Sequence, residues 1–235
     1  MGSVYGPNIV TDNLAVYFDA GNVQSYPGSG TTWYDIVGSN NGTLVNGPAY
    51  NSGDGGYFIL DSTNDYIAMI NGNIVIKSAG GWTIESWVYA TSIGNGTWGP
   101  RNLTGHDDAG TVGWYWSMYN SKLAIWNKSP GVWKYGSTTL TAGVWMHCVC
   151  VSENVSGTSY QFYLNGVAEG GDHASYTFSG AGVYKYLEFQ YIGKGNDANP
   201  RLWYGRYSAM RMYTEPLSAA EVLQNYNAHK SRFGL

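Results

Sequence analysis

The feature that most constrains this sequence is a succession of short runs rich in β-branched and aromatic residues, each bounded by clusters of Gly, Asn, Ser, Asp or Pro. Such runs are typical of β-strands, and their regular punctuation is typical of a sandwich or a barrel. Helical periodicity is nearly absent, so an all-β fold is expected. The predicted strands cover residues 14–18, 57–60, 66–70, 74–76, 82–89, 113–119, 123–126, 145–152, 160–164, 186–192 and 207–213.

Two Asn-Gly pairs predict tight hairpins, because both residue types tolerate the positive φ angles that a type I′ turn requires. Asn71-Gly72 lies between the predicted strands 66–70 and 74–76, and Asn165-Gly166 follows the predicted strand 160–164. Each pair is therefore expected to join two antiparallel strands and to fix their register.

Alternation within the predicted strands indicates which side chains form the core. Trp82, Ile84 and Val88 fall on one face of their strand, while Thr83 and Glu85 fall on the other. Successive side chains of a strand point to opposite faces, so the apolar set is predicted to face inward.

The two cysteines are predicted to be buried thiols. Cys148 and Cys150 are two positions apart and share one face of a predicted strand. That spacing, roughly 6–7 Å, is too long for an unstrained disulfide. His147 points to the opposite face, so a metal site at this pair would lack a third ligand nearby.

One helix is predicted near the C-terminus. Ser218 and Glu221 have the spacing of a capping box, in which each side chain accepts from the other residue's backbone amide. Leu217 can pack against Val222 as a hydrophobic staple. The helix is expected to run to about residues 229–230 and to seal one edge or end of the sandwich.

Composition and charge exclude several function classes. Only 12% of the 235 residues are charged, the net charge is −4, and Lys and Arg form no run, so nucleic acid is not an expected partner. No segment reaches the roughly 18 apolar residues of a membrane span. The N-terminus lacks the regions of a signal peptide, so synthesis in a cytoplasm is expected. The chain 1–235 is predicted to be one domain.

Several phrases resemble the laminin-G-like, concanavalin-A-like jelly-roll domains. They occur in the family's order along nearly the whole chain: WTIESWV at 82–88, GVWMHCV at 143–149, YLNG at 163–166, YIG at 191–193, the stretch 204–213 and PLSAAE at 216–221. The resemblance implies a two-sheet antiparallel jelly-roll sandwich closed by one short C-terminal helix.

A narrower resemblance is to the domains of this type in virion structural proteins of tailed, cyanophage-like phages. It is carried by LAVYFDAGN at 14–22, SYPGSGTTWYD at 25–35, NGTLVNGP at 41–48, VLQNYNA at 222–228 and RFGL at 232–235. It implies a location on the virion surface, with phage capsid or tail proteins as partners.

Calcium is left open as a ligand. The relatives often carry an acidic residue after the closing Gly-x-Ile, which contributes to a calcium site, whereas this chain has Ser208 there. Other oxygen ligands would have to converge from several loops, and the alternative role of such residues is in Asx turns. The candidates are Asp19, Asp35, Asp61, Asp65, Asp107-Asp108 and the cluster 196–199.

A sugar site would use exposed aromatic faces beside polar side chains. The predicted ligand-binding residues are Trp98, His106, Asp107, Asp108, Trp114 and Trp133, with Trp116, Trp126 and Trp203 as further candidates. Trp114 and Trp116 alternate with Tyr115, so one side of that strand must face the core. The alternative for each of these residues is core packing or a protein interface.

No catalytic residue is predicted. Relatives with this jelly roll that cleave glucans use two carboxylates on one strand, whereas Glu85 is alone on its strand and the other glutamates are isolated. No His accompanies a nucleophile motif. With no catalytic residue predicted, the resemblance to virion proteins implies a non-catalytic phage virion structural protein, a capsid decoration or small head or tail surface protein. The alternatives are a carbohydrate-binding adhesin for host-surface glycans and, third, a glucan hydrolase. A homo-oligomer stays open.

Overall fold

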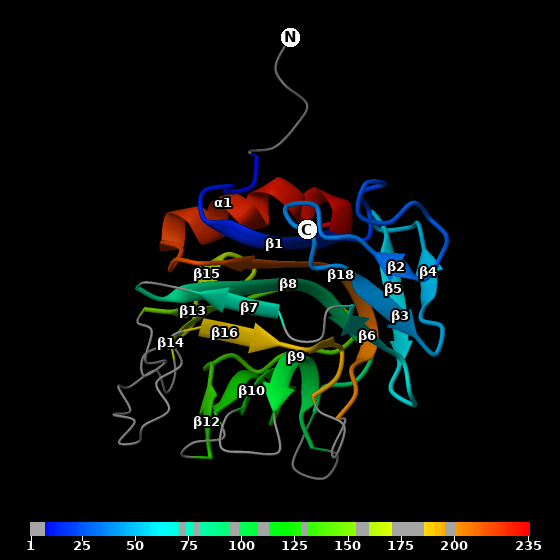
Figure 1. Cartoon of the computed structure of the whole chain (residues 1–235). Helices are drawn as coiled ribbons and strands as arrows, with labels where there is room; N and C mark the ends of the chain where they lie inside the picture. Colours follow the sequence, from blue (N-terminus) through cyan, green and yellow to red (C-terminus); the bar gives the residue numbers. More distant parts are fainter. Residues whose placement is uncertain are drawn as a thin grey trace.

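The computed structural model describes residues 8–70, 74–77, 80–94, 99–107, 113–127, 131–153, 160–170, 186–195 and 201–235. For residues 74–77, 106–107 and 186–188 the description is of the backbone. Within these ranges the chain forms two eight-stranded sheets, one two-stranded ladder and one C-terminal helix (Figure 1). Every strand pair is antiparallel, so the predicted all-β sandwich with a terminal helix is confirmed.

The first sheet has the strand order β15-β14-β13-β8-β18-β5-β4, and β1 also pairs with β18. Its strands are β15 (Val167–Ala168), β14 (Tyr160–Leu164), β13 (Trp145–Ser152), β8 (Trp82–Ala90), β18 (Tyr204–Tyr213), β5 (Tyr57–Asp61), β4 (Ala49–Asn51) and β1 (Leu14–Asp19). The long central strands β8, β13 and β18 are buried at nearly every position, which means that both faces of this sheet are covered.

The second sheet has the order β12-β11-β10-β9-β17-β6-β3-β2. Its strands are β12 (Val132–Tyr135), β11 (Lys122–Asn127), β10 (Gly113–Tyr119), β9 (Arg101–Asp107), β17 (Tyr191–Ile192), β6 (Tyr66–Met69), β3 (Gly42–Val45) and β2 (Thr32–Trp33). The two-stranded ladder joins β16 (Tyr186–Phe189) to β7 (Ile74–Lys77).

The main core lies between the two sheets. Trp82, Ile84 and Val88 belong to it, as the alternation predicted. Cys148 and Cys150 lie in the same cluster as free, fully buried thiols, so that prediction is also confirmed. Burial raises the pKa of both thiols well above the ordinary range, which makes them unreactive side chains of the core.

One of the two predicted hairpins is confirmed. Asn165 and Gly166 have φ angles of 52° and 79°, and they connect β14 to β15 through the facing pair Leu164 and Val167. Both positive φ values are those that a type I′ turn requires.

The other predicted hairpin is wrong, although Asn71-Gly72 itself lies outside the described residues. β6 and β7 both pair antiparallel with the continuous run β16–β17, so they point the same way and cannot be two arms of one hairpin. Between the Ala68–Tyr191 pair and the Ile74–Phe189 pair, the sequence from β6 to β7 advances six residues, whereas the sequence from β17 back to β16 covers only two. Asn71-Gly72 therefore does not join two strands that pair with each other.

The C-terminal helix α1 (Ala219–His229) begins at the predicted cap, because Ser218 and Glu221 form both reciprocal hydrogen bonds of a capping box. A 3₁₀ turn, η1 (Lys230–Phe233), follows it. The expectation that this helix seals an edge or an end is wrong. It lies over the outer face of the first sheet, beside β1 and β18 (Figure 1).

The outward side chains of the first sheet explain this position. Val149 and Tyr213 pack with Leu217 and Val222 in one apolar cluster, which includes the predicted staple pair. Trp87 stacks on Phe233, with ring centroids 4.3 Å apart. An outer face this apolar needs a cover, and the amphipathic C-terminal segment provides it. No helix in the described part of the chain has the length and apolar character of a membrane span.

Candidate functional site

The outer face of the second sheet carries a continuous group of aromatic rings at β10, β11 and β12. Alternation along β10 sends Trp114, Trp116 and Met118 into the core and leaves Tyr115 and Tyr119 on the outer side. Because this end of the sheet has no helix among the described residues packed on it, the outward rings are the natural candidates for contact with a ligand.

The strand register brings the outward rings of the other two strands beside these tyrosines. Trp126 on β11 faces Tyr115 on one side and Trp133 of β12 on the other, while Tyr135 faces the small residue Ala124. We name Tyr115, Tyr119, Trp126, Trp133 and Tyr135 the aromatic face.

Trp133 lies at the centre of the aromatic face. Its ring centroid is 4.9 Å from that of Tyr119, 6.3 Å from that of Tyr135 and 6.4 Å from that of Trp126. Trp126 in turn stacks on Tyr115 at 5.0 Å with an interplanar angle of 11°. Ring pairs at these separations stabilise one another, so the face is held in one arrangement without a ligand.

Four of the five rings are partly exposed, and the fifth supports them. Tyr119, Trp126, Trp133 and Tyr135 are half-buried, whereas Tyr115 is only 5% exposed beneath Trp126. Burial, followed by the neighbouring Tyr119, raises the pKa of Tyr135, so its phenol is neutral at physiological pH. A neutral ring with a hydroxyl can stack on an apolar surface and exchange hydrogen bonds at its rim.

Only part of the predicted ligand site comes together here. Trp133 is on the aromatic face, and so is Trp126 from the further candidates. Trp114 is in the core at 3% exposure and offers no exposed ring face. Trp116 and Trp203 are fully buried.

The remaining predicted site residues are on or near β9. The backbones of His106 and Asp107 lie opposite Trp114 and Gly113 on β10, and their side chains lie outside the description. Trp98 and Asp108 lie outside the described residues. Sequence reasoning missed Tyr135, because β12 was not predicted as a strand, and it missed Tyr119 although that residue lies within the predicted strand 113–119. The alternation Tyr115, Ser117, Tyr119 was the signal that could have found Tyr119.

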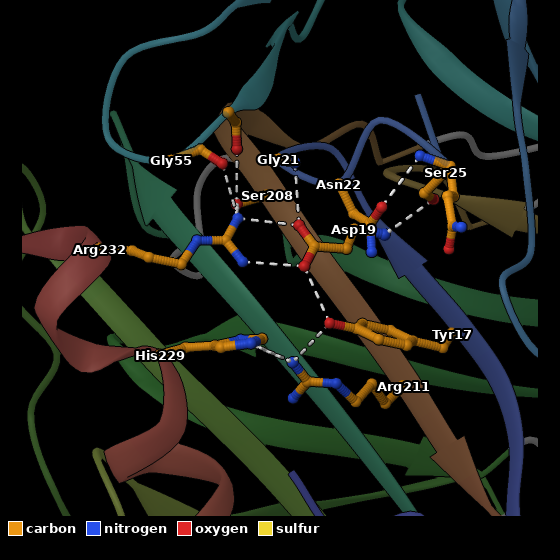
Figure 2. Close-up of polar contacts among 12 residues, drawn as sticks. Tyr17, Asp19, Gly21, Asn22, Ser25, Gly55, Ser208, Arg211, His229 and Arg232 are labelled. Carbon is orange, nitrogen blue, oxygen red and sulfur yellow. Dashed lines mark hydrogen bonds and ion pairs between the residues drawn. The ribbon is translucent and has the colours of Figure 1, made fainter. Parts of the chain in front are cut away.

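A second polar cluster lies on the outer face of the first sheet, around Asp19 (Figure 2). The Arg232 guanidinium donates to both Asp19 carboxylate oxygens at 2.8 Å, and its Nη2 also donates to the carbonyl of Gly55 at 2.7 Å. Tyr17 Oη donates to Asp19 at 2.9 Å. Burial would raise the pKa of Asp19, but Arg232 outweighs it and lowers that pKa, so the carboxylate is ionised.

Glu85, the lone acidic residue of β8, lies beneath α1 at 1% exposure. Arg211 pairs with its carboxylate, Asn225 Nδ2 donates to it at 2.9 Å, and His147 Nε2 is 3.4 Å away. Burial would raise the pKa of Glu85, but these neighbours, Arg211 first, lower it to about 2. This carboxylate is therefore a structural anchor between sheet and helix, closed off from any substrate.

The two clusters are connected through one arginine. Arg211 Nη2 lies 2.6 Å from Nδ1 of His229 and 3.4 Å from the hydroxyl of Tyr17, as Figure 2 shows. Burial, then Arg211 and Arg232, lower the pKa of His229 to about 3, so its imidazole is neutral and can accept from Arg211.

Asp19, Asp35 and Asp61, three of the acidic residues considered as calcium ligands, have other partners. Asp35 accepts from the backbone amides of Tyr17 and Val37, and Asp61 accepts from that of Thr63 at 2.7 Å, which is the geometry of Asx turns. Ser208 donates to the carbonyl of Gly56 at 2.6 Å. In the described part of the chain, no three His, Cys, Asp or Glu side chains gather as metal ligands. Asp108 and the cluster 196–199 lie outside that part.

The family model described as the Concanavalin A-like lectin/glucanases superfamily matches residues 61–223. No curated protein sequence gives a match.

Several solved structures share the fold. The structure of domain 4 of AbnA, a GH43 extracellular arabinanase from Geobacillus stearothermophilus, in complex with arabinotriose, has a TM-score of 0.63 at 17% identity, covering 91% of this chain and 98% of that one. The binding domain of Paraclostridial Mosquitocidal Protein 1 has a TM-score of 0.64 at 18% identity over 92% of this chain and 52% of that one.

Trypanosoma rangeli sialidase in complex with the inhibitor DANA has a TM-score of 0.62 at 12% identity. The match covers 98% of this chain but only 36% of the sialidase, so the chain spans about a third of that enzyme's length. Identities this low establish a common fold and leave ligand and activity to be argued from the site.

Proposed function

This chain belongs to the Concanavalin A-like lectin/glucanases superfamily, and from its geometry we propose that it is a non-catalytic carbohydrate-binding domain. The observation that carries the proposal is the aromatic face on β10–β12, with four partly exposed rings around Trp133. Aromatic side chains bind sugars by stacking against their apolar C–H faces, and a fixed set of rings does so with little loss of side-chain entropy.

The structural neighbours support the same proposal. The AbnA domain is described in complex with arabinotriose, and the mosquitocidal protein segment is described as a binding domain. These are properties of those proteins, and they make a glycan the ligand class to test first for this chain.

The non-catalytic part of the proposal rests on Glu85. Most glycoside hydrolases, including those that cleave glucans, use two carboxyl groups on either side of the scissile bond, roughly 5–9.5 Å apart depending on the stereochemistry. Glu85 is sealed under α1 by Arg211 and Asn225, and the strands β10–β12 that carry the aromatic face contain no Asp or Glu.

A glycan array probed with the wild-type chain and with Trp133→Ala tests the proposal. We expect selective binding by the wild type that the variant loses, with unchanged thermal unfolding of the variant and no release of reducing sugar from any bound glycan. A flat array for a folded wild-type chain, with and without calcium, would refute carbohydrate binding. Hydrolysis of a bound glycan would refute the absence of catalysis.

A second candidate function is a virion-surface structural protein that decorates a capsid or a tail. Its specific support is the resemblance of residues 14–48 and 222–235 to virion proteins of tailed phages, most of which lies outside the family match at 61–223. Proteomics of purified particles from the source of this sequence tests it. Several copies per particle would support decoration, and absence from particles would refute it.

A further inference from the structure

We infer that the aromatic face takes single, soluble glycan chains with a twisted backbone, and not the flat surface of a crystalline polysaccharide. The inference rests on the proposed carbohydrate-binding function and names the class of ligand for the same site. It follows from how the exposed rings are inclined to one another.

The exposed rings do not share a plane. The interplanar angle is 40° between Trp126 and Trp133, 47° between Tyr119 and Trp133, 34° between Tyr119 and Tyr135, and 24° between Trp133 and Tyr135. A flat ligand surface can stack on several rings at once only when their planes are nearly parallel and level. On this face it would stack on one ring and lose contact with the others.

A twisted glycan chain does not require the rings to be parallel. Consecutive sugars of such a chain are rotated about the chain axis, so each can present its apolar face to a differently inclined ring. The rings lie on three neighbouring strands, about 10 Å apart from first to last at the usual strand spacing, which suits a short stretch of chain.

The inclination is a property of the sheet and is not free to flatten. Adjacent strands rotate by roughly 20–25° in a twisted sheet, so side chains on β10, β11 and β12 are turned progressively. Trp126 is fixed by its stack on Tyr115, and the small residue Ala124 leaves the space over which Tyr119, Trp133 and Tyr135 meet. Levelling the rings would require breaking these contacts.

The chemistry of these strands fits an uncharged or acidic chain better than a basic one. The basic residues of β10–β12 are Lys122 and Lys134, and these strands contain no Asp or Glu. Lys122 faces Tyr119 across the strand pair, at one end of the aromatic face. A carboxylated sugar is therefore tolerated at that end.

The test compares two forms of ligand with the same intact chain. Affinity gel electrophoresis measures binding to soluble arabinan, xylan and β-1,3-glucan, and a pull-down measures binding to microcrystalline cellulose and to chitin. We expect retardation by at least one soluble chain and no more than background binding to both crystalline surfaces.

Three variants assign the binding to the aromatic face. Trp133→Ala should weaken binding to the soluble chain about tenfold or more, and Trp133→Phe, which keeps a ring, should retain most of it. Tyr204→Ala removes a similarly exposed ring, 37% exposed, on the other sheet and should bind as the wild type does.

The outcomes separate the two proposals. Binding to crystalline surfaces as strong as to soluble chains, and lost in Trp133→Ala, would overturn this inference and leave carbohydrate binding intact. Binding to neither form would overturn the proposed function itself. Soluble binding that survives Trp133→Ala would overturn the placement of the ligand on this face.

Discussion

At the scale of single residues, the ion pair between Arg232 and Asp19 gives the first prediction. The Arg232 side chain is 22% exposed, and its guanidinium neutralises the carboxylate of Asp19, a side chain that is only 5% exposed. Removing one partner of a buried ion pair leaves the other charge uncompensated. We expect Arg232→Ala to lower the free energy of unfolding by about 3 kcal/mol in urea titration.

The chain offers a matched control for this prediction. Arg206 pairs with Asp54 at 3.1 Å, with the two side chains 32% and 47% exposed. Exposed pairs of this kind contribute about 0–1 kcal/mol, so Arg206→Ala should change stability little by the loss of the ion pair. Equal losses for the two variants would show that the buried position of Asp19 is not what matters.

The Arg232→Ala substitution should also change how the protein responds to calcium. In the wild type, the Arg232 guanidinium contacts three oxygen groups: the Asp19 carboxylate, the Gly55 carbonyl and the Ser208 hydroxyl. In Arg232→Ala these groups would face a vacated space. These are the oxygen types that a hard cation prefers. Calcium at millimolar concentration should therefore raise the melting temperature of the variant more than that of the wild type. An equal response of both proteins would contradict this expectation.

His229 should make the stability of the folded chain depend on pH. Its pKa is about 3 in the folded chain and 6.5 ordinarily, so between these values the unfolded chain binds a proton that the folded chain does not. Stability must then fall as the pH drops below about 6.5, by at most about 1.4 kcal/mol per pH unit for one proton. Glu85, with a pKa of about 2, adds its own loss below its ordinary value of 4.5.

The variant His229→Gln isolates this contribution, because glutamine keeps an acceptor for Arg211 but does not titrate. Urea titrations between pH 7 and pH 5, where Glu85 contributes little, should show a shallower slope of stability against pH for the variant. Parallel slopes for the two proteins would mean that His229 is not neutral in the folded chain.

At the scale of elements, the capped helix α1 was predictable because its signals are local. The capping box of Ser218 and Glu221 can be read within four residues, and both of its hydrogen bonds form. We expect Ser218→Ala to cost about 1 kcal/mol in stability, measured by chemical unfolding. Ser231→Ala, an exposed change outside the cap, is the control and should be close to neutral.

The two Asn-Gly pairs show that a local turn signal alone does not predict which strands pair. Asn165-Gly166 joins β14 to β15 because β14 has a free edge for the returning strand. The strand β6 has no such edge, since β3 and β17 occupy both of its sides. The same dipeptide therefore joins two paired strands in one place and lies between two strands that do not pair with each other in the other, and only the sheet order distinguishes the two cases.

At the scale of the whole molecule, strand alternation and family phrases were sufficient for the sandwich but not for the site. Trp133 was predicted, yet the ring cluster depends on β12 pairing with β11, and the four-residue run of β12 carries no alternation signal of its own. Trp114 was misplaced for a related reason. Its strand has aromatic residues on both faces, so the core side could not be read from composition.

A crystal structure with a bound oligosaccharide is the direct test of whether a glycan binds on the aromatic face of the second sheet. The crystals should be soaked or grown with the soluble glycan that binds most tightly. We expect sugar rings stacked on Trp133 and on at least one of Tyr119, Trp126 and Tyr135. Sugar density at another position, with the aromatic face free of ligand and of crystal neighbours, would contradict it.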